Sequence, residues 1–352
     1  MAVDAGLPMD SSGDVRNRWR ALVVLVVSAV VAAACAGGED SEPVTLSLGY
    51  PFAADHPVRV GVLDQWAEDV WEATGNTVRV EFHPEQALST AAETYGNVAA
   101  GGQDIGWALQ GYSPGRFPAT GVVEMPFVFG SGAQATMTLW ALYEEFEALR
   151  DEYADVKVLG LWTSGPGDLW LVDGTASSVT DLAGLTLRSP TPVQAAVITA
   201  LGAIPVNMAA PDMRAAIDAG EIDGLLTVDT ALATHNLTDV IASGTECRCY
   251  VLASFLVMNL DTWNGLSPDQ QAAMDGVAGR TVSDAAAGFY DRASITAAQE
   301  NAAAGIVKIQ LDDDQLDEWK QATRSVVDDW ADSNPGFDAR AMYERMLELA
   351  AG

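Results

Sequence analysis

The sequence predicts an α/β protein of two domains, and three observations support this prediction. Apolar residues make up 49% of the 352 residues, enough to build a folded core despite a formal net charge of −31. The length corresponds to two domains of roughly 150 residues each. Short apolar runs alternate with segments of helical periodicity, which is typical of mainly parallel sheets covered by helices on both faces.

Strands and helices alternate through the first half of the chain. Val44–Tyr50 is a short alternating apolar run and forms the first predicted strand. Apolar residues then recur at helical spacing from Val58 to Thr74, and Gly75 ends that helix. The further elements predicted in this half are the strands 77–82, 104–109 and 156–162 and the helices 91–100 and 133–149.

The second half repeats this order and ends in helices. Tyr250–Leu260 is one long apolar strand, and Ser267 then begins a helix that we expect to run almost unbroken to about Ala304. At 1.5 Å per residue this helix would measure roughly 50 Å, longer than a small domain, so it is expected to span both domains. The other predicted elements are the strands 169–172, 185–188, 204–206 and 223–228 and the helices 193–201, 213–219, 314–332 and 338–349.

The first 43 residues are predicted to lie outside the fold. Arginines at 16, 18 and 20 precede the apolar run Ala21–Val31 and a set of small residues that ends at Cys35, which is the order of a secretory signal peptide. The apolar run is shorter than the about 20 residues of a transmembrane helix. A cysteine directly after small residues resembles a bacterial lipobox, and a plain signal peptide with an unrelated cysteine is the alternative.

The lipobox interpretation divides this leader at Cys35. Residues 1–34 are then a lipoprotein signal peptide, Cys35 carries the lipid, and residues 35–43 tether the domain to the outer face of the cell membrane. Residues 1–34 contain three acidic and three basic side chains, so the charge of −31 belongs to the exported part. So acidic a protein is not expected to bind nucleic acid or an anionic lipid surface.

Two further cysteines, Cys247 and Cys249, lie two residues apart. Export permits a disulfide. On a regular extended strand, however, the two side chains would lie too far apart for an unstrained bridge, so we expect packed small side chains, with a strained bridge as the alternative. The three histidines are scattered along the sequence and do not complete a zinc site with these cysteines. No metal ion or cofactor is predicted.

Gly111–Gly115 matches the G-x-S-x-G pattern of a hydrolase nucleophile, but the chemistry is incomplete. The oxyanion hole needs the backbone N–H group of the residue after Ser113, and Pro114 has none. Only His235 follows in the sequence as a possible base. Metalloprotease, phosphate-loop and dinucleotide-binding patterns are absent from the sequence. We therefore expect no enzyme and keep a secreted hydrolase as the alternative, which ester and amide turnover with a Ser113→Ala variant would test.

Strand ends supply the candidate ligand site, because ligands of open α/β sheets bind beyond the carboxyl ends of strands. Arg188 ends an apolar strand in a chain with few basic residues. Its guanidinium group can hold a carboxylate through two parallel hydrogen bonds; an ion pair between the domains is the alternative. The other candidate ligand-binding residues at strand ends are Phe52, Gln86, Trp107, Trp162, Thr227 and Asp229.

Seven short segments follow one another between residues 54 and 259. They are Ala54–Pro57 (ADHP), Tyr112–Pro118 (YSPGRFP), Glu124–Phe127 (EMPF), Asp181–Arg188 (DLAGLTLR), Leu201–Met208 (LGAIPVNM), Ala219–Gly224 (AGEIDG) and Phe255–Asn259 (FLVMN). In this order they resemble the DctP-like solute-binding proteins of TRAP transporters, and the most specific is DLAGLTLR, similar to the family's D-L-x-G-[LK]-x-[IL]-R. The resemblance covers the chain from about residue 44 to residue 352.

The resemblance implies a periplasmic-binding-protein-like clamp of two domains, with a long helix spanning both. Domain one would comprise residues 44–163 with 254–290, and domain two residues 164–253 with 291–352. The clamp would close on a small organic acid and deliver it to a membrane permease of the TRAP type. A ligand-sensing module for a signalling receptor has the same fold and is the alternative.

Arg188 matches the carboxylate-binding arginine of the family, so the resemblance implies this role for it. The sequence departs from the family pattern twice: no basic residue stands near 165–168, and 225–229 replaces a polar segment. Both departures argue against a dicarboxylate or a sialic-acid-like ligand, because a second charge would remain unpaired. The aromatic residues Trp107, Trp162, Trp170 and Phe52 suit a monocarboxylate with an apolar or aromatic body, and Arg116 is expected to be structural.

Overall fold

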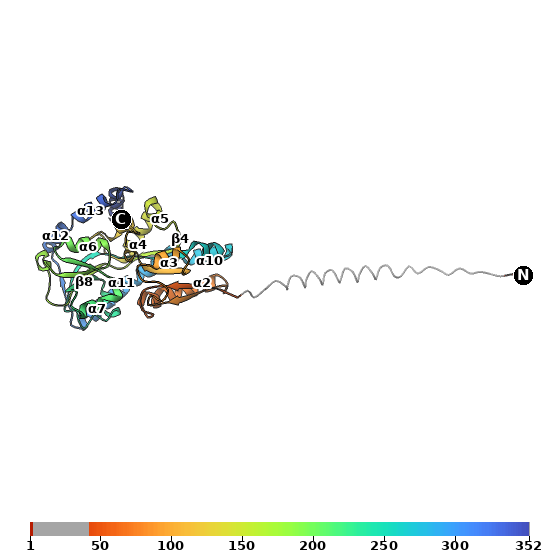
Figure 1. Ribbon diagram of the computed structural model, residues 1–352, viewed down its shortest axis with the longest axis horizontal. Coiled ribbons are helices and arrows are strands. Elements are labelled where there is room, and N and C mark those ends of the chain that lie inside the picture. Colours follow the sequence, from red (N-terminus) through yellow and green to blue (C-terminus); the bar gives the residue numbers. More distant parts are fainter. Residues whose placement is uncertain (3–41, 352) are drawn as a thin grey trace. The chain divides into compact units, whose positions relative to one another are not determined.

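A computed structural model describes residues 1–2 and 42–351, and two β-sheets form its frame (Figure 1). Residues Pro43–Gly352 form one compact unit that contains both sheets. All but the first two residues of the predicted signal peptide, Cys35 and all but the last two residues of the predicted tether lie outside the described residues. In the described part of the chain, no helix combines the length and the apolar character needed to cross a membrane.

Within residues 42–351, the first sheet has five strands: β1 (Val44–Gly49), β2 (Val78–His83), β3 (Ile105–Leu109), β4 (Val156–Thr163) and β10 (Ala253–Asn259). They lie in the order β2-β1-β3-β10-β4. β1 is parallel to β2 and β3, whereas β10 runs antiparallel to both of its neighbours.

The second sheet has six strands in the same part of the chain: β5 (Gly167–Leu171), β6 (Thr186–Ser189), β7 (Ile204–Asn207), β8 (Gly224–Thr227), β9 (Ser243–Tyr250) and β11 (Val307–Gln310). Their order is β11-β9-β5-β8-β6-β7. β6 is parallel to β7 and β8, whereas β5 is antiparallel to β8 and β9. Each sheet therefore contains one reversed strand, β10 in the first and β5 in the second, and each of these enters directly after the chain has crossed from the other sheet. The other described strands of each sheet share one direction, so the prediction of mainly parallel sheets is confirmed.

The two crossings between the sheets lie side by side, at 164–166 and 251–252. The backbone N–H group of Ser164 donates to the carbonyl oxygen of Leu252 (2.9 Å), and the N–H group of Leu252 donates to Ser164 Oγ (3.0 Å). Two short connections tied together in this way place the carboxyl end of β4 and the start of β10 at the boundary between the sheets.

Helices of 5 to 24 residues complete the described fold (Figure 1). They are α2 (Asp64–Ala73), α3 (Thr94–Ala99), α4 (Gly132–Glu145), α5 (Glu147–Asp151), α6 (Pro192–Ala200), α7 (Met213–Asp218), α8 (Asp229–Thr234), α9 (Leu260–Gly265), α10 (Pro268–Val277), α11 (Arg280–Ala303), α12 (Asp313–Ala322), α13 (Ser325–Ser333) and α14 (Ala339–Ala351).

The long helix expected from Ser267 to Ala304 is interrupted. α10 ends at Val277 and α11 begins at Arg280, because Gly279 adopts a positive φ of 63° and its N–H group donates to the carbonyl oxygen of Leu159 in β4 (2.6 Å). α11 packs on α4 and β4 of the first sheet and on α8 beside the second sheet. The expectation of a long helix spanning both domains is thus confirmed, with α11 as that helix.

Several other boundaries differ from the prediction. The predicted helix 133–149 is divided at Phe146, whose extended backbone separates α4 from α5, and the predicted helix 314–332 is divided into α12 and α13. β9 was not predicted because its sequence SGTECRCY lacks an apolar run, and the four-residue β11 and the short α8 were also missed. Asp312 caps α12 through the backbone N–H group of Gln315, so the acidic run there has a structural role.

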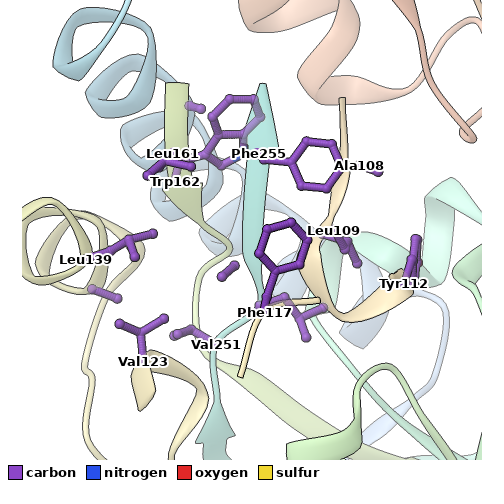
Figure 2. Packing of buried hydrophobic residues seen from close by; sticks show 14 of the residues in the cluster. Ala108, Leu109, Tyr112, Phe117, Val123, Leu139, Leu161, Trp162, Val251 and Phe255 are labelled. Atoms are coloured by element: carbon purple, nitrogen blue, oxygen red, sulfur yellow. The ribbon is translucent and has the colours of Figure 1, made fainter. Parts of the chain in front are cut away.

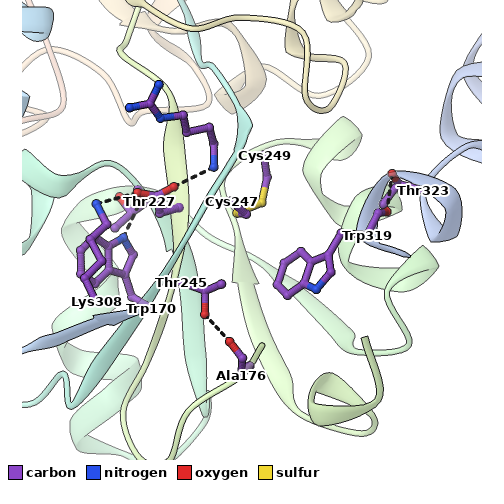
Figure 3. Close-up of a disulfide and its surroundings, with 11 residues drawn as sticks. Trp170, Ala176, Thr227, Thr245, Cys247, Cys249, Lys308, Trp319 and Thr323 are labelled. Atoms are coloured by element: carbon purple, nitrogen blue, oxygen red, sulfur yellow. Dashed lines mark hydrogen bonds and ion pairs between the residues drawn. A yellow bond between two sulfur atoms is a disulfide. The ribbon is translucent and has the colours of Figure 1, made fainter. Parts of the chain in front are cut away.

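Cys247 and Cys249 form a disulfide, so the prediction of unpaired packed cysteines was wrong (Figure 3). The expectation assumed a regular strand. Arg248 instead adopts a positive φ of 48°, which brings the two Cα atoms within 5.0 Å of each other. Both cysteines are buried, and the N–H group of Arg248 donates to Asp168 Oδ1 (2.8 Å).

Aromatic and aliphatic side chains from neighbouring strands fill the core of the first sheet (Figure 2). Phe255 in β10 lies opposite Ala108 in β3 on one side and Leu161 in β4 on the other. Trp162 is fully buried in the same cluster. β3 and β4 end, and β10 begins, at the boundary between the sheets, where the candidate site lies.

Candidate functional site

Two nitrogen atoms of the Arg188 guanidinium group form hydrogen bonds with neighbouring residues, and the third has no partner among the described residues. Arg188 lies in β6, and its side chain is 1% exposed. Nε donates to the carbonyl oxygen of Met208 (3.1 Å), and Nη1 donates to the carbonyl oxygen of Leu226 (2.9 Å). Among residues 42–351, no acidic side chain forms an ion pair with Arg188, and the buried Nη2 atom has no hydrogen-bond partner. A guanidinium group in this state can accept an anion as an additional partner.

Arg188 lines a cavity of about 50 Å³ between the two sheets. This volume is several times the roughly 10–15 Å³ that one water molecule requires. Phe52 faces it from the side of the first sheet and Thr227 from the second, and α11 contributes Phe289 and Tyr290. None of the described lining residues is acidic.

Two histidines line the same cavity, and both are uncharged at neutral pH. Burial, assisted by charge repulsion from its neighbour His235, lowers the pKa of His56 to about 3. Burial likewise lowers the pKa of His235 to about 4, assisted by the positive charge of Arg188. At pH 7 Arg188 is therefore the single charged side chain among the described lining residues.

Of the predicted site residues, Phe52, Arg188 and Thr227 meet at this cavity. Trp107 and Trp162 do not line it and are buried in the core of the first sheet. Trp107 nevertheless supports the wall, because its ring lies 4.8 Å from that of Phe52, measured between centroids.

The remaining candidates lie elsewhere. Gln86 lines a separate hollow of about 350 Å³, together with Tyr112. Trp170 is buried in β5, and its Nε1–H group donates to the carbonyl oxygen of Thr227 in the neighbouring strand β8 (3.0 Å; Figure 3). Asp229 points to Lys308, with 2.9 Å between Oδ2 and Nζ.

Lys308 in β11 neutralises two buried carboxylates at once. Its Nζ atom lies 2.8 Å from Asp168 Oδ2 and 2.9 Å from Asp229 Oδ2, and both acids are at least nine-tenths buried. Burial raises the pKa of Asp168 to about 6, although Lys308 opposes this rise. The family pattern has a basic residue near 165–168, whereas this protein has the acidic Asp168 there.

Ser113 and Arg116 have surroundings that agree with structural roles. Ser113 lies beside a second cavity of about 210 Å³, and no histidine is among the described residues that line it. Arg116 pairs with Asp155 (2.6 Å) and lies over the ring of Tyr95, 4.6 Å from its centroid.

Sequence reasoning missed His56, His235, Phe289 and Tyr290 as lining residues. His56 carried one signal, since it belongs to the ADHP segment directly after the first strand. His235 ends α8, and Phe289 and Tyr290 lie in the middle of α11, so only the packing of distant segments brings them together.

Glu124 is a buried carboxyl group that links the two halves of the fold. It ends a short helix, η3 (Thr120–Glu124), and is 4% exposed. Its oxygens accept hydrogen bonds from Thr191 Oγ1 (2.6 Å), which caps α6, and from the N–H group of Ala253 in β10 (3.3 Å). Burial raises the pKa of Glu124 to about 7, while these two hydrogen bonds lower it in part.

This pKa predicts a pH-dependent effect of the Glu124→Gln substitution. Between pH 4.5 and about 7, Glu124 is ionised in the unfolded chain but protonated in the native protein. Rising pH therefore lowers the free energy of unfolding of the wild type, whereas the variant, which lacks this carboxyl group, has no such loss. The free energy of unfolding of the variant, relative to wild type, should rise by about 3 kcal/mol across this range. Chemical denaturation of both proteins at several pH values measures the difference. A matched Glu81→Gln change at an exposed site should show no such slope, and a constant difference for Glu124→Gln would contradict the assignment.

Two mixed sheets, a helix spanning both domains and a cavity between the sheets define a solute-binding protein of the periplasmic type. The chain belongs to the family described as bacterial extracellular solute-binding protein, family 7 (DctP), whose model matches residues 48–334. This confirms the resemblance to the solute-binding proteins of TRAP transporters. Members of this family are binding proteins of transport systems rather than enzymes.

Known relatives are similar to this protein over most of its chain. The outer membrane transporter protein TsaT of Comamonas testosteroni is 24% identical over 299 residues, which cover 81% of this chain and 85% of that protein. A crystal structure of a TRAP solute binding protein from Rhodoferax ferrireducens, in complex with copurified benzoate, is 26% identical with a TM-score of 0.84 and covers 88% of this chain and 98% of that one. A marine metagenome TRAP solute binding protein specific for aromatic acid ligands, in complex with metahydroxyphenylacetate, is 25% identical with the same TM-score and the same coverage.

Proposed function

We propose that this protein captures an aromatic monocarboxylate outside the cytoplasm and delivers it to a TRAP-type membrane permease. The observation that carries this proposal is the buried, unpartnered Nη2 atom of Arg188 at a cavity whose described lining has no acidic residue. A carboxylate there would receive charge-assisted hydrogen bonds, which are shorter and stronger than neutral ones.

The lining supports a ligand with one charge and an aromatic body. Phe52, Phe289 and Tyr290 offer apolar faces against which a ring can pack. A dicarboxylate would leave its second charge without a cation, since both lining histidines are neutral at pH 7. The structures from Rhodoferax ferrireducens and the marine metagenome, both at least 25% identical, hold benzoate and metahydroxyphenylacetate, which supports the same ligand class.

We also propose the domain division 44–163 with 254–290 and 164–253 with 291–352. Apart from Ala253 at the start of β10, the strands of the first sheet fall within the former set, and those of the second sheet fall within the latter. Arg188 and Phe52 then belong to different domains, so closure of the two domains would enclose the ligand.

A thermal-shift screen of residues 36–352 tests the ligand class. Benzoate and its monocarboxylate relatives should raise the melting temperature, whereas succinate and other aliphatic dicarboxylates should not. Stabilisation by dicarboxylates alone would overturn the proposal.

Lipid attachment at Cys35 is proposed from the sequence, because this residue lies outside the described part of the chain. Substituting Cys35→Ser should move the full-length protein from the membrane fraction to the soluble exported fraction, because the acyl chains would be missing. Fractionation with immunoblotting measures this shift, and an Ala36→Ser variant serves as the matched control. A Cys35→Ser protein that stays with the membrane would refute the anchor.

A further inference from the structure

We infer that His56 is a specificity-determining residue, whose Nε2–H group selects aromatic monocarboxylates that carry an oxygen acceptor on the ring. The inference rests on the proposed function and narrows it to hydroxylated or otherwise oxygen-substituted aromatic acids. Two observations support it: the positions of the unengaged polar groups that line the cavity, and the fixed orientation of the His56 ring.

The polar groups of the cavity are distributed unequally between the two sides. Arg188 and Thr227 come from strands of the second sheet. Thr230 and Thr234 come from α8, which follows β8, and His235 is the residue directly after α8. A carboxylate on Arg188 would therefore lie at the polar side of the cavity, with its ring directed toward the first sheet.

On the side of the first sheet, His56 offers the unengaged donor. The described lining residues there and at the crossings between the sheets are apolar except for His56 and Ser164. Ser164 Oγ is already engaged, because it donates to the carbonyl oxygen of Gly165 (2.8 Å) and accepts from the N–H group of Leu252 (3.0 Å). Apart from the polar groups of the second sheet and of the α8 segment, the remaining polar group of the described lining is the hydroxyl of Tyr290 on α11.

Neighbouring rings and one backbone bond fix the orientation of His56. Its ring centroid lies 4.7 Å from that of Phe52 and 5.2 Å from that of Trp107, and the residue is 9% exposed. The N–H group of Val58 donates to Nδ1 (3.3 Å), so the ring proton belongs on Nε2.

A neutral donor discriminates between kinds of acceptor. With its pKa lowered to about 3 by burial, His56 brings no second positive charge into the cavity. It therefore suits a hydroxyl, ether or carbonyl oxygen rather than a second carboxylate. A ring without such an oxygen would leave the buried N–H group unpaired, which costs binding free energy.

Titration calorimetry with benzoate and the three hydroxybenzoate isomers tests the inference. Wild type should bind its best hydroxybenzoate about fivefold more tightly than benzoate, the effect of one ordinary hydrogen bond. His56→Phe keeps an aromatic ring but loses the donor, so the preference should vanish while benzoate affinity stays within about twofold. His56→Gln restores an N–H donor and should restore the preference. His83→Phe, at a half-exposed histidine in β2, should behave as wild type.

The outcomes separate the inference from the proposed function. If wild type binds benzoate as tightly as each hydroxybenzoate, the inference is wrong and the proposed function stands; this result needs no variant to fold. If His56→Phe keeps the full preference, His56 is not the determinant. If wild type binds none of the four acids, both the inference and the proposed ligand class fail.

Discussion

Replacing Arg188 by alanine should weaken the binding of an aromatic monocarboxylate by at least about 100-fold. Charge-assisted hydrogen bonds contribute about 1.5–3 kcal/mol each, and Arg188 can offer the carboxylate more than one N–H group. No other charged side chain among the described lining residues can replace it. Calorimetry on wild type and Arg188→Ala, with benzoate as the first probe, measures the loss.

Arg188→Lys provides the comparison that separates charge from geometry. Lysine keeps the positive charge but lacks the planar fork, so its affinity should lie between those of wild type and Arg188→Ala. Arg116→Ala, which breaks the surface pair with Asp155, should leave affinity unchanged and serves as the control. Retention of wild-type affinity by Arg188→Ala would exclude Arg188 as the carboxylate anchor.

Replacing Lys308 by methionine should destabilise the protein by roughly 3–5 kcal/mol at pH 8. The change leaves Asp168 and Asp229 buried without their shared cation, and an uncompensated buried charge is costly. The loss should shrink toward pH 5, because Asp168, whose pKa is already about 6 in wild type, then takes up a proton. Chemical denaturation at both pH values measures the free energies of unfolding.

Two variants control this experiment. The double substitution Lys308→Met with Asp168→Asn should recover part of the loss, because one of the two buried charges is removed. Lys320→Met breaks an exposed pair with Asp317 and should change stability by less than about 0.5 kcal/mol. Equal losses for Lys308→Met and Lys320→Met would contradict the buried-charge account.

The sequence predicted those parts of the fold that depend on local pattern. β10 is apolar throughout, so its sequence sufficed to identify it, whereas β9 is built from small and polar residues and is a strand only because β5 and β11 pair with it. The break at Gly279 was missed because it depends on a hydrogen bond to Leu159, which is distant in sequence. The disulfide was missed for a similar reason, because one positive φ at Arg248 changes the distance between its neighbours.

The candidate site was predictable only in part. Arg188 stood out because a basic residue ends an apolar strand in an acidic chain. Trp107 and Trp162 also lie near strand ends, but sequence alone does not distinguish a core side chain from one that lines a cavity. The neutral state of both histidines depends on burial, and also on His235 for His56 and on Arg188 for His235, so it follows only from three-dimensional packing.

A crystal structure of the exported domain with benzoate would show whether an aromatic monocarboxylate binds between the two sheets on Arg188. We expect the carboxylate within hydrogen-bond distance of Arg188 Nη2, with the ring against Phe52 and Phe289. Benzoate bound instead in the cavity beside Gln110 and Glu124, with Nη2 still unpaired, would contradict this expectation.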